Sequence, residues 1–198
     1  MNKITEILVG TNNIGKYREI CNLLPKSIKK HSPKDFKLLT PEESGESFEE
    51  NSIIKASYFS KKTNLLCLSD DSGLEIDILN GAPGIFSSRW SGPKNDFNLA
   101  IEKVFERMNK IKKDWKVINL ARFVCCLTLF WPDGKSFSSK GIINGKISNI
   151  KKGKNGFGYD PIFIPNGYDQ TFGEMEPKLK MLIDHRFKAY LQIKKFFN

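Results

Sequence analysis

Short apolar runs alternate with amphipathic stretches along the chain. The runs that are apolar and short enough for buried strands are 4–10, 65–68 and 121–131. The stretches with apolar residues at helical spacing are 16–24, 47–61 and 96–111. Ser47 and Glu50 form a capping box, which predicts where the second helix begins. This alternation of strands and helices predicts an α/β fold.

The remaining pattern predicts shorter elements. Pro132-Asp133-Gly134 turns the strand 121–131 back into 135–147 as a hairpin. Two further short strands are expected at 36–39 and 161–165. A last helix begins near Pro177, where a proline is well tolerated. Its expected packed face consists of Leu179, Leu182, Ile183 and Phe187. On the helix 47–61 the expected buried side consists of Phe48, Ile54, Tyr58 and Phe59, with Glu49, Asn51 and Lys55 near the polar side.

The stretch 65–90 joins a buried strand to two acids. Asp70 and Asp71 follow the strand, and Ser72-Gly73 is expected to form a tight turn before a half-buried strand at 74–78. Adjacent carboxylates raise each other's pKa, and a bound divalent cation would remove that cost. Two acids alone are also typical of a solvated surface turn. The surrounding polar groups favour a metal site.

Composition is that of a folded protein without a membrane segment. The chain has 198 residues, of which 39% are hydrophobic, enough for a core within one domain. No run approaches the roughly 18 apolar residues of a membrane span, and the first residues lack the pattern of a signal peptide. Its four cysteines lack C-x-x-C spacing, which favours reduced thiols in a cytoplasmic protein.

A net charge of +10 points to an anionic partner. Nucleic-acid binders concentrate Lys and Arg on one face or tail, whereas here Lys is spread along the chain. A small polyanion such as a nucleoside triphosphate would be attracted equally well. The alternative function, a non-catalytic basic protein that binds nucleic acid or nucleotides, therefore stays open at this point.

A polar loop joins the first strand to the first helix. The free backbone N–H groups and the dipole at a helix N-terminus favour a bound anion. Thr11 and Asn13 add short polar side chains, and Lys16 adds a positive charge. The loop lacks the Walker spacing, and plain helix capping is the alternative for Asn13.

The second polar stretch combines glycine with aromatic residues. Phe157-Gly158-Tyr159-Asp160 would let a planar base approach the backbone and stack on an aromatic ring. Asp160 could accept hydrogen bonds from a purine edge, while His185 and Arg186 could donate to a keto oxygen or a phosphate. The alternative is a structural turn beside a core histidine.

Taken together, these motifs resemble the inosine triphosphate pyrophosphatase family, also called Ham1-like. The motifs that carry the resemblance are Thr11-x-Asn13-x-x-Lys16, Glu50-Asn51-x-x-x-Lys55-Ala56, Asp70-Asp71-Ser72-Gly73-Leu74, Gly81-Ala82-Pro83-Gly84 with Ser88-Arg89, Gly156-Phe157-Gly158-Tyr159-Asp160-Pro161, and Lys180 followed by His185-Arg186. The resemblance implies one pyrophosphatase domain over 1–198, an elongated two-lobed mixed β-sheet flanked by helices with a central nucleotide cleft. It implies a cytoplasmic homodimer that uses Mg²⁺ to hydrolyse ITP, dITP and XTP to the monophosphate and pyrophosphate. Such an enzyme cleanses the nucleotide pool of deaminated purines, without a stable nucleic-acid or membrane partner.

The resemblance also assigns roles to residues of this chain. The triphosphate-binding positions are matched by Thr11, Asn13, Lys16, Lys55 and Ser72. The metal-site acids are matched by Glu42 and Asp71, and Asp71 is also the expected general base. The base and ribose positions are matched by Phe157, Gly158, Tyr159, Asp160, Lys180, His185 and Arg186. The chain departs from the family pattern at Asp184, where Ser is usual, and at Lys140, where Glu is common.

Overall fold

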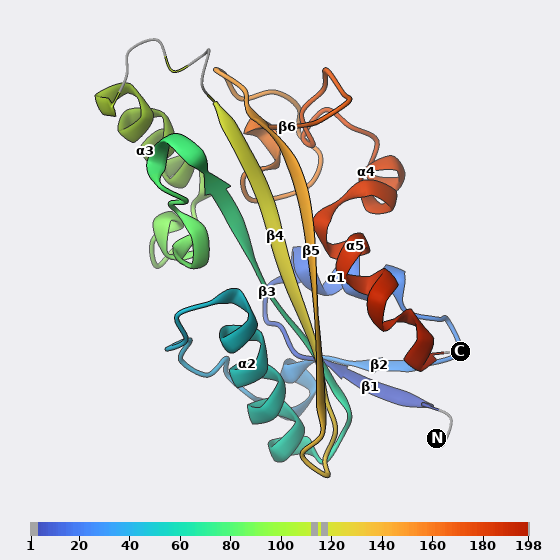
Figure 1. Cartoon of the computed structure of the whole chain (residues 1–198). Helices are drawn as coiled ribbons and strands as arrows, with labels where there is room; N and C mark the ends of the chain where they lie inside the picture. Colours follow the sequence, from blue (N-terminus) through green and yellow to red (C-terminus); the bar gives the residue numbers. More distant parts are fainter. Residues whose placement is uncertain (1–3, 112–114, 116–118, 198) are drawn as a thin grey trace. The chain divides into compact units, whose positions relative to one another are not determined.

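The computed structural model, which describes residues 4–111, 115 and 119–197, contains a six-stranded mixed sheet (Figure 1). Its strands are β1 (Glu6–Val9), β2 (Lys29–His31), β3 (Cys67–Ile76), β4 (Leu120–Phe130), β5 (Ser136–Ile147) and β6 (Phe163–Pro165). Their order in the sheet is β2-β1-β3-β4-β5-β6. β1 pairs in parallel with β2 and β3, and β5 pairs antiparallel with β6. The predicted α/β class is therefore confirmed.

Five α-helices accompany these strands in the described part of the chain. They are α1 (Ile14–Leu23), α2 (Phe48–Thr63), α3 (Phe97–Ile111), α4 (Pro177–Ile183) and α5 (His185–Ile193). Half of the predicted capping box before α2 is present: Ser47 Oγ accepts a hydrogen bond from the amide of Glu50, whereas Glu50 Oε2 accepts from the amide of Glu46 and not from that of Ser47. None of the described helices combines the length and the apolar character needed to cross a membrane.

The chain divides into two compact units. Unit 1 comprises Met1–Asp71, Cys125–Gly141 and Arg186–Asn198, and unit 2 comprises Ser72–Val124 and Ile142–His185. In unit 1, β1 packs its apolar residues into a core with α1, α5 and β4. Buried members of this core are Ile7, Val9, Ile20, Leu68, Cys125, Leu127 and Ile193. The free cysteines follow the prediction of reduced thiols.

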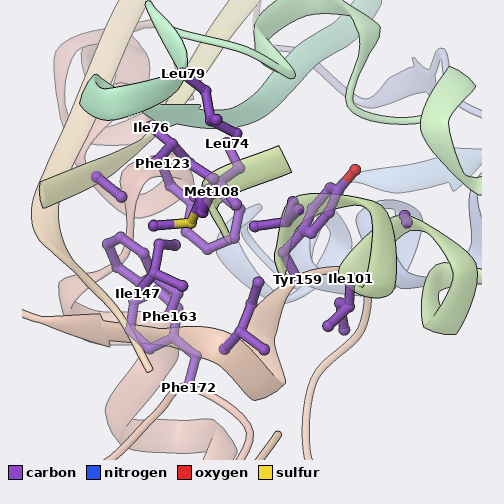
Figure 2. Close-up of a cluster of buried hydrophobic side chains, with 14 of the residues drawn as sticks. Leu74, Ile76, Leu79, Ile101, Met108, Phe123, Ile147, Tyr159, Phe163 and Phe172 are labelled. Atoms are coloured by element: carbon purple, nitrogen blue, oxygen red, sulfur yellow. The ribbon is translucent and has the colours of Figure 1, made fainter. Parts of the chain in front are cut away.

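Unit 2 has its own core, formed by α3, β6 and the parts of β3, β4 and β5 that belong to this unit. Figure 2 shows its buried side chains, among them Leu74, Met108, Phe123 and Phe163. Ile101 and Met108 of α3 are buried as their helical spacing predicts, and Phe105 packs against the same core.

A turn at Ser72-Gly73 was expected, and this prediction is wrong. β3 runs without interruption from Cys67 to Ile76, so the two expected strands are one. Gly73 is buried and does not adopt a positive φ. Ser-Gly is common in turns, which is why the residue types predict one here. In the structure, pairing with neighbouring strands keeps the backbone of Ser72 and Gly73 extended.

Two further predictions fail for related reasons. The strand expected at 36–39 is replaced by β2 and a 3₁₀ turn at Pro33–Phe36, which Ser32 and Asp35 cap. The last helix is interrupted at Asp184, and Leu179 and Leu182 are exposed on α4.

Candidate active site

The carboxyl end of β1 leads into the N-terminus of α1. Asn13 Oδ1 accepts a hydrogen bond from the amide of Lys16 at 3.0 Å, and Thr11 Oγ1 accepts one from the amide of Asn13 at 3.2 Å. Asn13 thus caps the N-terminus of α1. Lys16 points its ammonium at Asp70, with Nζ 3.2 Å from Oδ2. The helix N-terminus and Lys16 together still suit an anion.

Asp70 is buried among positive charges. Its Oδ2 accepts from the guanidinium of Arg186 at 3.1 Å as well as from Lys16, and Arg186 also pairs with Glu19. Burial alone would raise the pKa of Asp70, but Lys16, Arg186 and Lys55 outweigh it and hold that pKa well below its usual range. Asp70 is therefore an ionised carboxylate that fixes two cations.

Asp71 shares the ammonium of Lys55 with Glu43. Asp71 Oδ1 lies 3.0 Å from Lys55 Nζ, and Glu43 forms a close ion pair with the same nitrogen. Lys55 was placed near the polar side of its helix, yet it is only 4% exposed, and Asn51 beside it is fully buried. Burial raises the pKa of Asp71, with the nearby Glu43 charge adding to it against the effect of Lys55 and Lys16.

The second oxygen of Asp71 marks a place for a cation. Oδ2 is buried and has no hydrogen-bond partner among the described residues. An ionised oxygen without a partner is costly in a protein interior, and a metal ion is one way to satisfy it. No group of three or more His, Cys, Asp or Glu in the described part of the chain could hold a metal by itself. This donor set fits Mg²⁺, which commonly binds through one or two carboxylates together with water and substrate phosphates.

The acidic loop before α2 is tied to that helix. Asn51 Oδ1 accepts from the amide of Gly45 at 2.9 Å, and Glu50 Oε2 accepts from the amide of Glu46 at 2.7 Å. Glu42, the acid expected at the metal, is exposed and makes no hydrogen bond or ion pair with the described residues. Glu43 is the acid that reaches Lys55. The spacing of two neighbouring acids in a loop gives no signal for which one points inward.

In unit 2, Asp160 holds the loop that carries Phe157. Its Oδ2 accepts from the amide of Phe157 at 2.8 Å and from the ammonium of Lys180 at 2.7 Å. That ammonium also lies over two aromatic rings, 5.1 Å from the centroid of Phe157 and 5.4 Å from that of Phe172. Lys180 is turned inward for this reason, which explains why Leu179 and Leu182 of the expected face are exposed, whereas Ile183 and Phe187 pack against the cores as predicted.

The same loop depends on glycine and on a buried tyrosine. Gly156 and Gly158 have φ values of 72° and 67°, which favour glycine. Tyr159 is buried beside the unit 2 core (Figure 2), and its hydroxyl donates to the carbonyl of Ser87 at 2.9 Å. Burial raises the pKa of that hydroxyl. Phe157 is only half-buried, which leaves part of its ring available to a ligand.

His185 begins α5 and stacks on Phe123. The two ring centroids lie 4.8 Å apart with an angle of 11° between the planes. His185 and the neighbouring Asp184 are both buried. The aromatic partner of His185 lies 62 positions earlier in the chain, so helical spacing could not have identified it.

The predicted site residues thus fall into two groups. The group in unit 1 contains Thr11, Asn13, Lys16, Lys55, Asp71 and Arg186, together with the exposed Glu42. The group in unit 2 contains Phe157, Gly158, Tyr159, Asp160, Lys180, His185 and the half-buried Ser72. Sequence reasoning missed Glu19 and Glu43, and it placed the buried Asn51 near the polar side of its helix. Glu19 lies three residues after Lys16 on α1, a helical spacing that could have suggested it.

Comparison with known proteins gives consistent matches over nearly the whole chain. Residues 7–196 match the Ham1 family. The dITP/XTP pyrophosphatase of Caulobacter vibrioides is 39% identical over 189 residues, which are 96% of each chain. The dITP/XTP pyrophosphatase of Rhizobium meliloti is 42% identical over 93% of this chain and 92% of its own length.

The fold agrees with solved structures of the same kind. A HAM1 protein from Coxiella burnetii matches with a TM-score of 0.86 and 36% identity, covering 97% of this chain and 98% of that one. The Ham1 protein of Staphylococcus aureus matches with a TM-score of 0.81 and 34% identity, covering 96% and 97%. Because both its sequence and its fold match over nearly the whole chain, this chain belongs to the Ham1 family.

Proposed function

We propose that this protein hydrolyses non-standard purine nucleoside triphosphates, namely dITP, ITP and XTP, to the monophosphate and pyrophosphate. Relatives that are about 40% identical over nearly the full chain are dITP/XTP pyrophosphatases. The observation that carries the proposal is the buried Asp71, which has one oxygen against Lys55 and the other without a partner among the described residues.

The unit 1 group provides the phosphate-binding chemistry. Lys16 and Lys55 supply two ammonium groups, and the N-terminus of α1 supplies backbone N–H donors. Asp70 keeps Lys16 in place, because its buried carboxylate stays ionised. An arrangement of this kind neutralises the charge that develops when a phosphoanhydride bond breaks.

Asp71 is the proposed general base and a metal ligand. Its raised pKa makes the carboxylate a better proton acceptor for the water that attacks the α-phosphorus. Mg²⁺, when bound by Asp71 and the acidic loop that carries Glu42 and Glu43, would neutralise phosphate charge. Lys55 would hold the Asp71 side chain in one orientation through its 3.0 Å contact.

The unit 2 group provides the base-binding chemistry. Phe157 offers a half-exposed ring for stacking, and His185 offers a ring nitrogen that can donate to O6 of hypoxanthine or xanthine. A 6-amino purine would leave such a donor unpaired, a mismatch that discriminates by about 10⁴-fold in sites of this kind.

We propose a homodimer that acts on the cytoplasmic nucleotide pool, as the family resemblance implies. Sedimentation analysis of the full chain would test the dimer directly.

A substrate panel with Mg²⁺ tests the function. Pyrophosphate release is measured from dITP, ITP, XTP, dATP, ATP and GTP, with the purified full chain. Turnover of the first three in clear excess over ATP and GTP is expected. Comparable turnover of ATP and ITP would contradict the proposed base recognition. Tight, steeply salt-dependent binding to DNA without any pyrophosphate release would instead favour the non-catalytic alternative.

A further inference from the structure

Unit 1 contains a cavity that none of the proposed site residues lines. Its volume is about 830 Å³, within the range of pockets that bind small molecules. The residues that line it are Ile4, Thr5, Glu6, Leu66, Trp131, Asp133, Lys135, Ser136, Phe137 and Phe196. All of them belong to unit 1, so the cavity can be described within that unit.

The cavity lies at the amino ends of β1 and β3, away from the phosphate-side residues of unit 1. Ile4 and Leu66 precede these strands, whereas Thr11 follows the carboxyl end of β1 and Asp71 lies in the middle of β3. Asp71 lies five positions after Leu66 along extended chain, a separation of about 16 Å. The hairpin turn between β4 and β5 contributes the other wall. The cavity is therefore separate from the proposed active site.

Three aromatic rings form a connected wall of this cavity. The centroid of Phe196 lies 5.5 Å from that of Trp131 and 5.0 Å from that of Phe137, both in edge-on contacts. The indole N–H of Trp131 makes no hydrogen bond within the described part of the chain. A ligand in the cavity could therefore contact the apolar surface of these rings and accept a hydrogen bond from the indole N–H of Trp131.

These rings already hold a positive charge. The ammonium of Lys195, an exposed residue, lies 5.1 Å from the centroid of Phe137 and 5.3 Å from that of Phe196. Ammonium groups are attracted to the faces of aromatic rings at such distances. Lys195 is not among the residues that line the cavity, but its position shows that the rings of Phe137 and Phe196 attract an ammonium group.

Carboxylates complete a site for a cation. The side chains of Glu6 and Asp133 are 47% and 54% exposed, so both acids lie where the cavity meets solvent. Glu6 pairs with His31 at 3.0 Å, and Asp133 pairs with Lys135 at 2.9 Å. Exposed pairs of this kind contribute little and are readily exchanged for another cation. Ile4 and Leu66 offer apolar surface for the body of the same ligand.

We propose that this cavity binds a small organic ammonium ion with an apolar body, its ammonium at the aromatic rings and the two acids and its body in the cavity. The inference rests on the cavity, the ring contacts and the carboxylates alone. It stands or fails independently of the proposed function, because binding is measured without a nucleotide.

Titration of the full chain with 2-phenylethylammonium tests this site, with 2-phenylethanol as the neutral probe of similar shape. Binding of the ammonium compound is expected with a Kd on the order of 1 mM, about fivefold tighter than that of the alcohol. The indole N–H signal of Trp131, identified from a Trp131→Phe variant, should shift on titration. Equal affinities for the two probes, or no saturation by about 20 mM, would overturn the proposal.

Two substitutions should change the preference in opposite directions. Lys195→Met removes the competing ammonium, so the charged probe should bind about threefold tighter and the alcohol should be unaffected. Glu6→Gln combined with Asp133→Asn should remove most of the preference for the charged probe. Both changes are at exposed side chains, so the fold should persist. An unchanged preference in both variants would also overturn the proposal.

Discussion

The ammonium of Lys55 lies 3.0 Å from a carboxylate oxygen of Asp71, and both side chains are buried in unit 1. Glu43 contacts the same ammonium from the loop before α2. In a protein interior, removal of one partner leaves the other charge uncompensated. This three-residue cluster, formed by Glu43, Lys55 and Asp71, therefore links the stability of unit 1 to the proposed chemistry.

Asp71→Asn should abolish turnover while the protein stays folded. The amide keeps the shape of the side chain and can still accept a hydrogen bond from Lys55, but it cannot take up a proton from water. We expect kcat to fall about 10³-fold, in the range that general bases contribute. Pyrophosphate release from dITP with Mg²⁺ measures the loss, and thermal unfolding followed by circular dichroism measures the fold.

Glu49→Gln is the matched control for that experiment. Glu49 is an exposed acid on α2, the helix that carries Lys55, and it should leave kcat unchanged. An Asp71→Asn variant that retained more than about a tenth of the activity would remove Asp71 from the role of general base.

Substitution of Glu43 should lower the free energy of unfolding, whereas substitution of Glu42 should barely change it. Glu43→Gln removes a charge that Lys55 contacts, so urea unfolding should show a loss of about 1 to 2 kcal/mol. Glu42→Gln changes an exposed side chain and should alter stability by less than about 0.5 kcal/mol. If Glu42 reaches the metal, its variant should instead need more Mg²⁺ for half-maximal activity. Equal stability losses in the two variants would contradict this separation.

Local features of the fold could be predicted from the sequence. The hairpin around Pro132-Asp133-Gly134, the N-cap of α2 by Ser47 and the amphipathic helix at 96–111 depend on residues close together in the chain. Each has a turn residue, a cap or a period that local physics makes recognisable. The ordered polar motifs were informative for the same reason, because each occupies only a few positions.

Features that depend on distant partners could not be predicted. Lys180 is buried because it meets Asp160, which lies 20 positions away, and Arg186 because it meets Asp70, 116 positions away. Periodicity assigns charged residues to the outside of a helix, so it wrongly predicts that Lys180 is exposed and that Leu179 and Leu182 are buried. The continuity of β3 through Ser72-Gly73 likewise depends on its neighbours in the sheet.

Asp160→Asn should destabilise the protein strongly. The amide can still accept from Phe157, but the buried ammonium of Lys180 loses its 2.7 Å ion pair with the Asp160 carboxylate. Breaking a buried pair in this way costs about 3 to 5 kcal/mol. Urea unfolding of Asp160→Asn, Lys180→Met and the double variant measures the coupling. The double variant should be less destabilised than the sum of the two single variants. Additive losses would show that the two charges do not depend on each other.

Gly156→Ala should cost more stability than Gly167→Ala, although both glycines have a positive φ. At Gly167, with φ of 85°, an added Cβ meets nothing within 4 Å, so only the backbone cost of about 1 kcal/mol applies. At Gly156, with φ of 72°, the Cβ would lie 2.0 Å from Asp160 Oδ2 and displace that carboxylate from Phe157 and Lys180. We therefore expect a loss of about 3 kcal/mol in urea unfolding, accompanied by a higher KM for dITP in the surviving folded enzyme. Gly167→Ala should leave KM unchanged, because Gly167 has no part in the loop that carries Phe157. Equal losses at the two positions would mean that Asp160 is free to move, and the assigned role of its carboxylate in holding Phe157 would be wrong.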